Sequence, residues 1–381
     1  MGSITLRIAD LRKKNRLTQQ ELADSIGVSY QTISKWETGI SMPDIVMLPA
    51  LSEYFQVSTD QLLGLEPLDD ETYIPEKTAT KDFWNNKLDY LLRTRRGYWN
   101  DDYIAFLVSQ VWKIDQTVSV LDCGCGYGFL GQLLLPCLPE GSTYTGIDYA
   151  EDLIQKGECL FADQKMSATL LCKDVFTHSA ENQYDLVICQ AVLRHLDDPA
   201  AFLQKMITFA KPGGYVISID ANREFECCGL YIDGMDYQEL CKHEGLEKKW
   251  QTELARQGRD YAIAIRTAHM MQKLGLTDVD VRMNDKVEFI TSQLPDYNEI
   301  RNDFIAYNDW TAGISAAERE RLIRHLLSHG LSHREAEDYC NRNVAIADFF
   351  AANPIAGYTF MKGQMISYGK KSIGKKSIPS D

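Results

Sequence analysis

Apolar residues in the first 64 positions recur at helical spacing, and the residues between them are those that begin and end helices. Polar residues that can accept hydrogen bonds from a first helical turn precede the apolar stretches, at Thr18, Ser29, Asp44 and Ser58. Glycines that can end a helix follow them, at Gly27, Gly39 and Gly64. This pattern predicts five short helices within residues 5–64.

From about residue 81 the pattern changes, because short apolar runs rich in β-branched residues alternate with helical stretches. The runs are VSVLDCG, STYTGIDYA, ATLLCKDVF, YDLVICQAV and GGYVISIDA. Such alternation predicts a parallel sheet covered by helices on both faces. Residues 222–258 and 295–355 depart from this rhythm and are expected to be helical cap insertions. The run GYTFMKGQMISYG near the end is expected to be a last strand.

Two stretches fit neither pattern. Residues 66–80 hold two prolines and five acidic residues with little apolar periodicity, which is typical of a linker. Residues 370–381 form a short basic segment that we expect to be mobile. The predicted organisation is therefore an all-α five-helix domain at 1–65, the linker, a doubly wound α/β domain at 81–369, and the tail.

The composition is that of an ordinary soluble globular protein, since 45% of the 381 residues are apolar and 25% are charged. The longest uncharged stretch is rich in glycine and proline, and the N-terminus lacks the apolar segment of a secretory signal. We therefore expect a cytoplasmic protein with no membrane contact. The ten cysteines include no C-x-x-C spacing, which favours reduced, buried thiols and argues against a metal site.

The formal charge of −14 is unevenly distributed. Residues 1–65 carry six basic and seven acidic residues, a net charge of −1, so the remainder carries 34 basic and 47 acidic residues, a net charge of −13. A body that acidic repels nucleic acid. Any DNA contact is therefore expected in the N-terminal domain.

The run TQQELADSIGVSYQTISKWETG has the pattern of two helices joined by a tight turn. Ala23 is small where the helices must cross closely, and Gly27 allows the turn. Ser29 then begins a second helix whose first turns offer polar side chains to solvent. Among these, Gln31 can form two hydrogen bonds with adenine, and Thr32 can bond a base or contact a thymine methyl group.

This segment resembles the phage-repressor-like (Cro/C1, XRE) helix-turn-helix family over about sixty residues, including a W-E-x-G-x-x-x-P ending that begins at Trp36. The resemblance implies that Gln19 contacts a DNA phosphate and that four side chains face bases, namely Tyr30, Gln31, Thr32 and Lys35. One copy reads one half-site, so we expect a homodimer on a nearly palindromic operator, with half-sites about 34 Å apart. A module that only dimerises, or has lost DNA binding, is the alternative.

A glycine-rich loop follows the first predicted strand, which ends at Asp122. Glycines at 124, 126 and 128 let the backbone approach a ligand closely between a strand and a helix. Asp148 closes the next strand, where a carboxylate can accept hydrogen bonds from both ribose hydroxyls. These residues alone do not identify the ligand, because they also satisfy the dinucleotide G-x-G-x-x-G pattern.

The whole series VLDCGCGYG, GIDYA, CKDVF, YDLVICQAVLRHLDDP and KPGGYVISID resembles the class I S-adenosylmethionine-dependent methyltransferases, which have a Rossmann-like fold, over residues 81–295. The resemblance implies that S-adenosylmethionine is the cofactor and S-adenosylhomocysteine the product. The residues that it implies for cofactor binding are Asp122, Gly124, Gly126, Gly128, Asp148, Tyr149, Asp174, Val175 and Gln190. Asp174 and Gln190 could equally be ordinary polar residues at strand ends.

Methyl transfer depends mainly on positioning, and a base is needed only when the acceptor must lose a proton. The candidate catalytic residues are His195, Asp220 and Tyr98. His195 could instead be a scaffold residue, and Asp220 could cap the segment that follows it. The candidate substrate-binding residues are Trp99, Tyr231, Met235 and Tyr237, any of which could instead belong to a core.

The acceptor is expected to be a small molecule. Enzymes that methylate bases within DNA commonly carry a D/N-P-P-Y/F/W tetrapeptide or a P-C-Q motif, and neither occurs here. The first hypothesis is an active small-molecule methyltransferase with a DNA-binding regulatory domain. The second is a transcriptional regulator whose methyltransferase fold senses cofactor or metabolite without catalysis, and the third is a nucleic-acid-modifying enzyme.

Overall fold

The computed structural model describes residues 4, 6–65, 73–74, 84–223, 228–240, 245–310 and 314–373. The chain divides into two compact units. The first holds residues 1–76, 242–253 and 311–352, and the second holds residues 77–241, 254–310 and 353–381. Most of the predicted linker and of the predicted tail lies outside the described residues. The predicted start of the tail is wrong, because Lys370 and Lys371 belong to the strand β10(Gln364–Lys371), and the rest of both interpretations stays a prediction.

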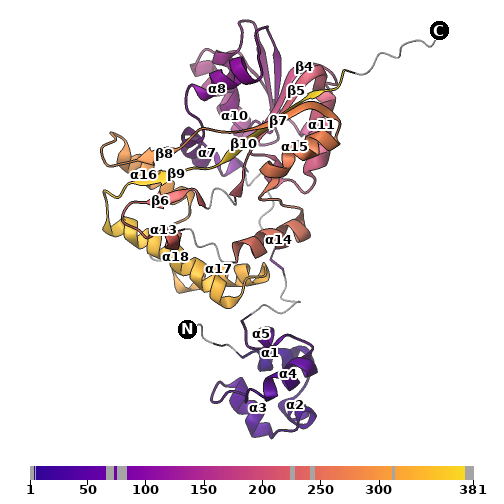
Figure 1. Cartoon of the computed structure of the whole chain (residues 1–381), viewed down its shortest axis with the longest axis vertical. Helices are drawn as coiled ribbons and strands as arrows, with labels where there is room; N and C mark the ends of the chain where they lie inside the picture. Colours follow the sequence, from indigo (N-terminus) through magenta and orange to yellow (C-terminus); the bar gives the residue numbers. More distant parts are fainter. Residues whose placement is uncertain are drawn as a thin grey trace, which may run out of the picture. The chain divides into compact units, whose positions relative to one another are not determined.

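The first 64 residues form the five predicted helices, α1(Ile8–Lys14), α2(Gln19–Ile26), α3(Tyr30–Glu37), α4(Met47–Phe55) and α5(Thr59–Leu62) (Figure 1). The side chains of Thr18, Ser29 and Ser58 accept hydrogen bonds from the first turns of α2, α3 and α5, as the start signals predict. Asp44 does not cap α4. Its carboxylate accepts a 3.1 Å bond from the Val46 N–H, which holds the turn before the helix.

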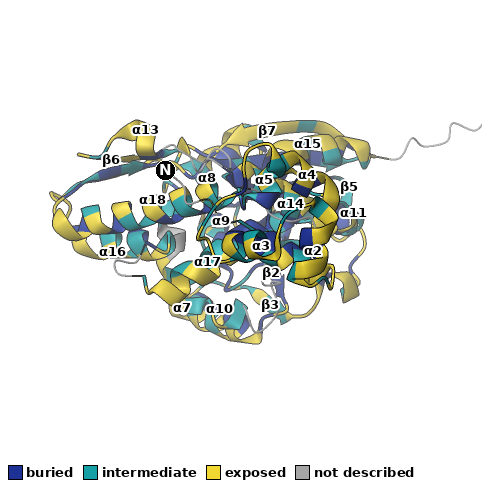
Figure 2. Ribbon diagram, turned by 90° about the horizontal axis from the view of Figure 1, so that it is seen from below, coloured by how far each residue is buried: buried dark blue, intermediate teal, exposed yellow. Residues whose placement is uncertain are grey.

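One apolar side of each helix faces a common core. The fully buried members are Ile8, Leu11, Leu22, Ala23, Ile33, Leu51 and Leu62. Figure 2 shows the same division over much of the molecule, since many helices are yellow on one side and dark blue or teal on the other. Helices whose apolar residues form one stripe are stable only when that stripe packs on a neighbour.

The second unit is built on a seven-stranded sheet of order β3-β2-β1-β4-β5-β10-β7. The strands are β1(Ser119–Cys123), β2(Thr143–Asp148), β3(Thr169–Cys172), β4(Tyr184–Gln190), β5(Ala210–Ala221), β7(Leu276–Met283) and β10(Gln364–Lys371). The five predicted runs form β1 to β5, which pair in parallel. The fold class predicted from the sequence is therefore confirmed.

Alternate residues of the central strands belong to opposite cores, as a sheet covered on both faces requires. Val120 and Ile188 pack with α8(Tyr103–Phe106), the π-helical turn η2(Leu107–Val111) and α9(Phe129–Leu134). Leu121 and Val187 pack with α11(Pro199–Phe209) and α15(Ile263–Lys273). The helix α10(Glu151–Asp163) connects β2 to β3.

The predicted last strand is wrong in one respect, because the run GYTFMKGQMISYG forms two strands rather than one. Gly363 has a φ of 62° and breaks the extended chain. The part before it, β9(Tyr358–Phe360), joins a separate three-stranded sheet of order β6-β9-β8, with β6(Leu230–Ile232) and β8(Glu288–Ile290). The part after it is β10, which is antiparallel to both β5 and β7.

The remaining helices lie before the sheet and in the two predicted insertions. They are α7(Leu88–Thr94), η1(Arg95–Tyr98), α13(Tyr237–Leu240), α14(Leu246–Gln257), α16(Tyr297–Tyr307), α17(Ala316–Ser328) and α18(His333–Ala352). Among the described residues, every helix is too short or too polar to cross a bilayer.

Candidate functional site

Polar residues collect where the parallel strands end. Asp122 lies near the end of β1, Asp148 ends β2, Gln190 ends β4, and Asp220 is the second-last residue of β5. All four are buried, with 1–8% of each residue exposed. Ligands of open parallel sheets bind outside this edge, so the position of these side chains marks it as the candidate site.

The loop after β1 strongly favours glycine at two of its turns. Gly124 and Gly128 have φ values of 78° and 74°, which other residues rarely adopt. A Cβ atom on Gly124 would lie 2.7 Å from Val192, and one on Gly128 would lie 2.6 Å from Phe161. The loop therefore presents bare backbone towards the edge of the sheet.

Asp148 fixes this loop to the neighbouring strand. Its Oδ2 accepts a 2.8 Å hydrogen bond from the Gly126 N–H, and its Oδ1 accepts a 2.9 Å bond from the Ala150 N–H. Burial raises the pKa of the Asp148 carboxyl, although these N–H groups favour the charged form. Burial and the Asp148 charge raise the pKa of the adjacent Tyr149 to about 12.

A small cavity of about 30 Å³ lies beside the loop. Asp122 and Gln190 line it, together with Tyr127 and with Leu91 of α7. The Asp122 carboxylate accepts a 2.7 Å hydrogen bond from the Tyr144 hydroxyl. Neither Tyr98, a candidate catalytic residue, nor Trp99, a candidate substrate-binding residue, is among the residues that line it.

Asp174 follows the end of β3 and caps the short helix η4(Val175–Thr177) by accepting a 2.8 Å bond from the Phe176 N–H. Its segment is held to β2, since the Lys173 N–H donates to the Asp148 carbonyl at 2.9 Å. Val175 is buried. The geometry thus gives Asp174 a structural role and leaves its predicted role with adenine a prediction.

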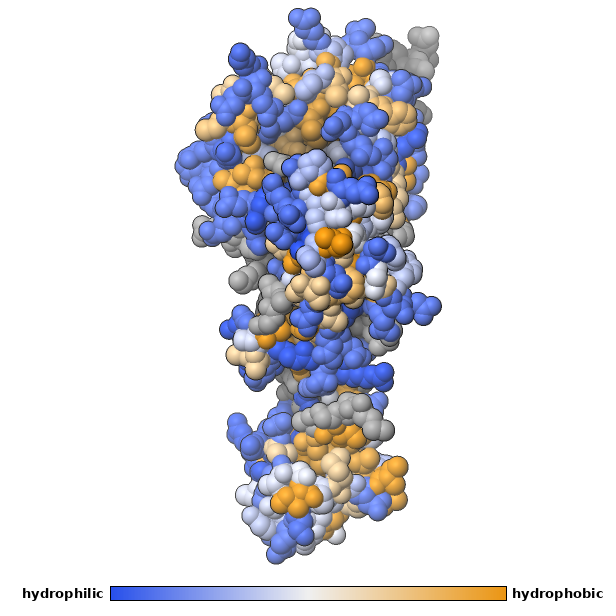
Figure 3. Space-filling view, turned by 90° about the vertical axis from the view of Figure 1, so that its left-hand side faces the viewer, coloured by the Kyte–Doolittle hydropathy of each residue, from blue (hydrophilic) through white to orange (hydrophobic). Residues whose placement is uncertain are grey.

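The N-terminal domain holds its predicted DNA-facing residues in two different environments. Tyr30, Gln31 and Lys35 are exposed, whereas Thr32 is half-buried and bonds Ser29 through the two hydroxyls at 2.9 Å. The Gln19 amide donates a 2.7 Å hydrogen bond to Glu37. Figure 3 shows hydrophobic patches among polar atoms on this domain, at the bottom of the view.

Family comparison decides what the two regions are. Residues 114–261 match the model of a methyltransferase domain, and residues 8–62 match the model of a helix-turn-helix. The chain combines a helix-turn-helix domain with a methyltransferase domain. The glycine loop and the four buried polar residues at the strand ends all fall within the methyltransferase match.

The chain is similar to curated proteins over part of the methyltransferase domain. A ubiquinone biosynthesis O-methyltransferase of Hydrogenovibrio crunogenus is 34% identical over 116 residues, which are 30% of this chain and 47% of the relative. Its counterpart in Vibrio parahaemolyticus is 28% identical over 163 residues, which are 42% of this chain and 63% of the relative. The chain therefore spans less than two thirds of these relatives.

A solved structure, the phosphoethanolamine N-methyltransferase 2 of Haemonchus contortus in complex with S-adenosyl-L-methionine, aligns with a TM-score of 0.42 and 11% sequence identity. The alignment covers 78% of this chain and 58% of that one.

The three candidate catalytic residues lie in the second unit, each with different partners. His195, in the turn η5(Leu193–His195), accepts a 3.2 Å bond at Nε2 from the Arg194 guanidinium and packs edge-on against Trp84. Asp220 accepts a 3.2 Å bond from the Ser218 hydroxyl. The Tyr98 ring lies beneath the Lys362 ammonium, 4.2 Å away. Their catalytic roles stay predictions.

The four candidate substrate-binding residues differ in burial. Trp99 is buried in a core of the second unit, stacked on Tyr103 with ring centres 6.2 Å apart. Tyr231 of β6 and Tyr237 of α13 are largely exposed, and Met235 is half-buried. The Tyr231 hydroxyl donates to Asp233 at 3.2 Å.

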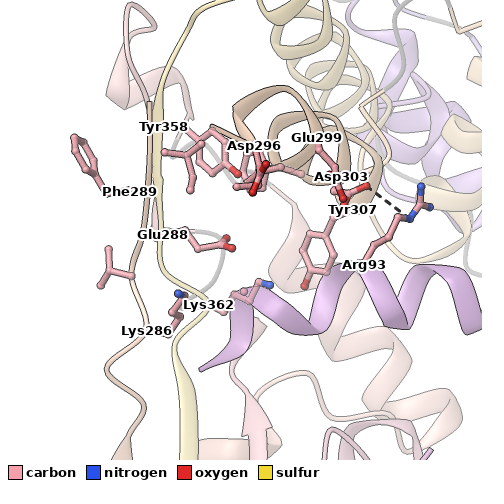
Figure 4. A pocket seen from close by; sticks show the side chains of 15 residues that line it. Arg93, Lys286, Glu288, Phe289, Asp296, Glu299, Asp303, Tyr307, Tyr358 and Lys362 are labelled. Carbon is pink, nitrogen blue, oxygen red and sulfur yellow. Dashed lines mark ion pairs between the residues drawn. The ribbon is translucent and has the colours of Figure 1, made fainter. Parts of the chain in front are cut away.

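A larger cavity, of about 460 Å³, was not predicted from the sequence. It is lined by α7, η1, β8, α16, β9 and the residues flanking the two strands. Figure 4 shows Glu288 and Lys362 directed into it, with Tyr307 of α16 opposite them. The signal that could have indicated it is Lys362 itself, a lysine between the two apolar segments YTF and QMISY.

Proposed function

We propose that this protein is an S-adenosylmethionine-dependent methyltransferase of a small-molecule acceptor whose helix-turn-helix domain binds operator DNA. The methyltransferase match and the relatives named O-methyltransferases support the activity. One observation carries the cofactor assignment: the Asp148 carboxylate is held against the glycine loop through the Gly126 N–H. The carboxylate that would bind ribose and the loop backbone that would surround the cofactor are therefore joined by a hydrogen bond.

The donor set at the strand ends fits S-adenosylmethionine. Asp148 would accept hydrogen bonds from the ribose hydroxyls, and Tyr149, which is 37% exposed, would lie against the nucleoside. Asp122, a buried carboxylate beside the loop, would face the ammonium group, and Gln190 would line the methyl-donor channel. Asp174 and Val175 would meet the adenine ring. When bound, the cofactor supplies a methyl group on a positively charged sulfur.

The chain's own contribution to the reaction is positioning. The rate of an in-line displacement is raised most by holding the acceptor aligned with the methyl group and by excluding water. We propose that His195, Asp220 or Tyr98 receives a proton when the acceptor must lose one. Trp99, Tyr231, Met235 and Tyr237 are the residues first proposed to contact the acceptor.

The DNA-binding part of the proposal is carried by α3. Its side chains Tyr30, Gln31 and Lys35 are exposed, and they would contact bases if α3 enters the major groove as a recognition helix does. We propose a homodimer on a nearly palindromic operator, with Gln19 beside a phosphate. If cofactor or acceptor regulates this binding, DNA must change the affinity for that ligand by the same factor.

The test is to incubate the full chain with methyl-labelled S-adenosylmethionine and cell extract, and then to separate small molecules, protein and nucleic acid. Label is expected in the small-molecule fraction, and none with Asp148→Ala. Asp163→Ala, an exposed aspartate at the end of α10, is the matched control and should behave as wild type. Label in nucleic acid would contradict the proposed substrate class. Cofactor binding without any label would support the sensing regulator instead.

A further inference from the structure

The 460 Å³ cavity lies next to the edge of the sheet that carries the cofactor residues. β10 begins at Gln364, paired with Ala221 at the end of β5, and β7 ends at Met283, paired with Met365. Neighbouring strands are about 4.8 Å apart, so β10 begins about 10 Å from the end of β4. Leu91 of α7 lines the small cavity beside the glycine loop, and Arg93 of the same helix lines the large one. The same helix therefore contributes residues to both cavities.

Its aromatic lining suits a flat ring. Phe304 of α16 and Tyr358 of β9 are stacked with ring centres 3.9 Å apart. Tyr307, one turn further along α16, also faces the cavity. The volume lies within the range of sites that enclose small organic molecules. The aromatic lining and the volume of the cavity therefore both favour an aromatic ligand.

Lys362 is buried to more than nine tenths in this lining. Its ammonium lies over the rings of Tyr98 at 4.2 Å and Tyr307 at 4.9 Å. Within the described part of the chain, no oxygen accepts a hydrogen bond from this ammonium. The ammonium borders the cavity, so an oxygen of a bound ligand can accept a hydrogen bond from it.

Glu288 is the buried carboxyl group beside it. A Cβ atom built on Gly97 would meet both the Glu288 carboxylate and the Lys362 ammonium, so the two groups border the same point in space. Burial raises the pKa of Glu288, although Lys362 and Lys286 favour its charged form. A carboxylate with a raised pKa is a better proton acceptor than an exposed one.

We propose that this cavity binds the methyl acceptor as a hydroxylated aromatic molecule, with Lys362 donating a hydrogen bond to the hydroxyl oxygen and Glu288 accepting its proton. The inference rests on the proposed methyltransferase activity and names its substrate class. A lone pair of the hydroxyl oxygen forms the new O–CH₃ bond. The bond between the methyl carbon and sulfur breaks, its electrons remain on the sulfur, and the proton passes to the Glu288 carboxylate and then to water.

The first experiment measures binding to the full chain by calorimetry, with 2-naphthol and its blocked analogue 2-methoxynaphthalene as probes. Because hydrogen bonds to charged groups contribute about 1.5–3 kcal/mol, 2-naphthol is expected to bind about tenfold more tightly or better. Lys362→Met should weaken the binding of both probes, because the ether oxygen also accepts a hydrogen bond from Lys362, and Glu288→Gln should reduce this preference to about threefold or less. Glu158→Gln and Lys273→Met, exposed on α10 and α15, are the matched controls and should keep it.

The second experiment measures transfer of labelled methyl to 2-naphthol as a function of pH. At S-adenosylmethionine concentrations that saturate the protein at every pH, the rate should fall at acidic pH as Glu288 becomes protonated, and this fall should be absent in Glu288→Gln. Other charged and titratable groups border the same cavity and are unchanged in that variant, namely Arg93, Lys286, Lys362, Asp296, Glu299, Asp303, Tyr307 and Tyr358. Gly97→Ala, which fills the space between Glu288 and Lys362, should weaken 2-naphthol binding while both charges remain.

S-adenosylmethionine affinity, measured in every variant, separates the two proposals and reports folding. The inference would be overturned, and the proposed function left standing, if cofactor affinity were unchanged, the hydroxyl preference survived in Glu288→Gln, and Lys362→Met and Gly97→Ala bound 2-naphthol as tightly as the wild type. Equal binding of the two probes to the wild-type chain would also overturn it. If the wild-type chain does not bind S-adenosylmethionine, the proposed function is refuted instead.

Discussion

The N–H of Gly126 and the carboxylate of Asp148 are joined by a 2.8 Å hydrogen bond, so the loop after β1 and the end of β2 hold each other in place. The carboxylate that would bind ribose is thereby part of the loop's own scaffold. A change at Asp148 should alter both the loop and the ligand contact.

Cofactor affinity should therefore depend on the ionisation of Asp148. Burial raises its pKa above the ordinary value of 3.8. As the pH falls through that raised pKa, the carboxylate loses an acceptor site, and affinity should fall by about tenfold per pH unit below it. Calorimetry between pH 4 and 8 measures this. Asp148→Asn should bind weakly at every pH, and an equally steep pH dependence in that variant would refute the assignment.

Gly128→Ala should destabilise the second unit more than Gly275→Ala does. Both glycines have positive φ, 74° and 87°, so both substitutions incur backbone strain. Only the Cβ at 128 meets a neighbour, Phe161 at 2.6 Å, whereas nothing lies within 4 Å of the one at 275. The difference should be about 1–3 kcal/mol in urea-induced unfolding. Equal losses would show that Phe161 moves aside freely.

Glu37 should stabilise the helix-turn-helix domain above mildly acidic pH. Burial opposes its ionisation, but hydrogen bonds from Arg12 (2.6 and 2.9 Å) and Gln19 outweigh burial and lower its pKa. The stabilisation is present above the unfolded pKa of about 4.5 and is lost as the pH falls through the lower folded pKa. Glu37→Gln should cost about 1–3 kcal/mol at pH 7.

Hydrogen exchange in peptides from residues 8–62 of the full chain measures this loss. Glu53→Gln, exposed on α4, is the control and should leave exchange unchanged. A loss for Glu37→Gln that persists undiminished at pH 3 would contradict the ion-pair explanation.

Gln31→Ala should reduce discrimination between DNA sequences more than overall DNA affinity. A two-bond contact with a base contributes about 1–3 kcal/mol of preference at one position. Lys35→Ala should also lower the salt dependence of binding by about one counterion, because it removes a positive charge beside the DNA. Selection from random DNA followed by salt titration distinguishes these roles. Gln251→Ala, exposed on α14, is the control.

Short-range patterns predicted much of this molecule. Thr18, Ser29 and Ser58 cap helices where they stand in the sequence, because a helix start depends on hydrogen bonds within a few residues. The glycine loop and Asp148 were also predictable, since a strand, a tight turn and a helix impose their residue types locally. The prediction that Asp44 caps α4 was wrong because an aspartate can either hold a turn or cap a helix, and in the structure Asp44 holds the turn before α4.

The sequence by itself determined the five N-terminal helices, the parallel strands β1 to β5 and the polar residues at their ends, because each depends on periodicity and on neighbours along the chain. Only the tertiary structure decided that β10 inserts between β5 and β7, and that Glu288 and Lys362 border one cavity. Those two residues are separated by more than seventy positions, so their proximity results from strand pairing and not from spacing. The free energy that holds them in place comes from burying the apolar surface of the sheets around them.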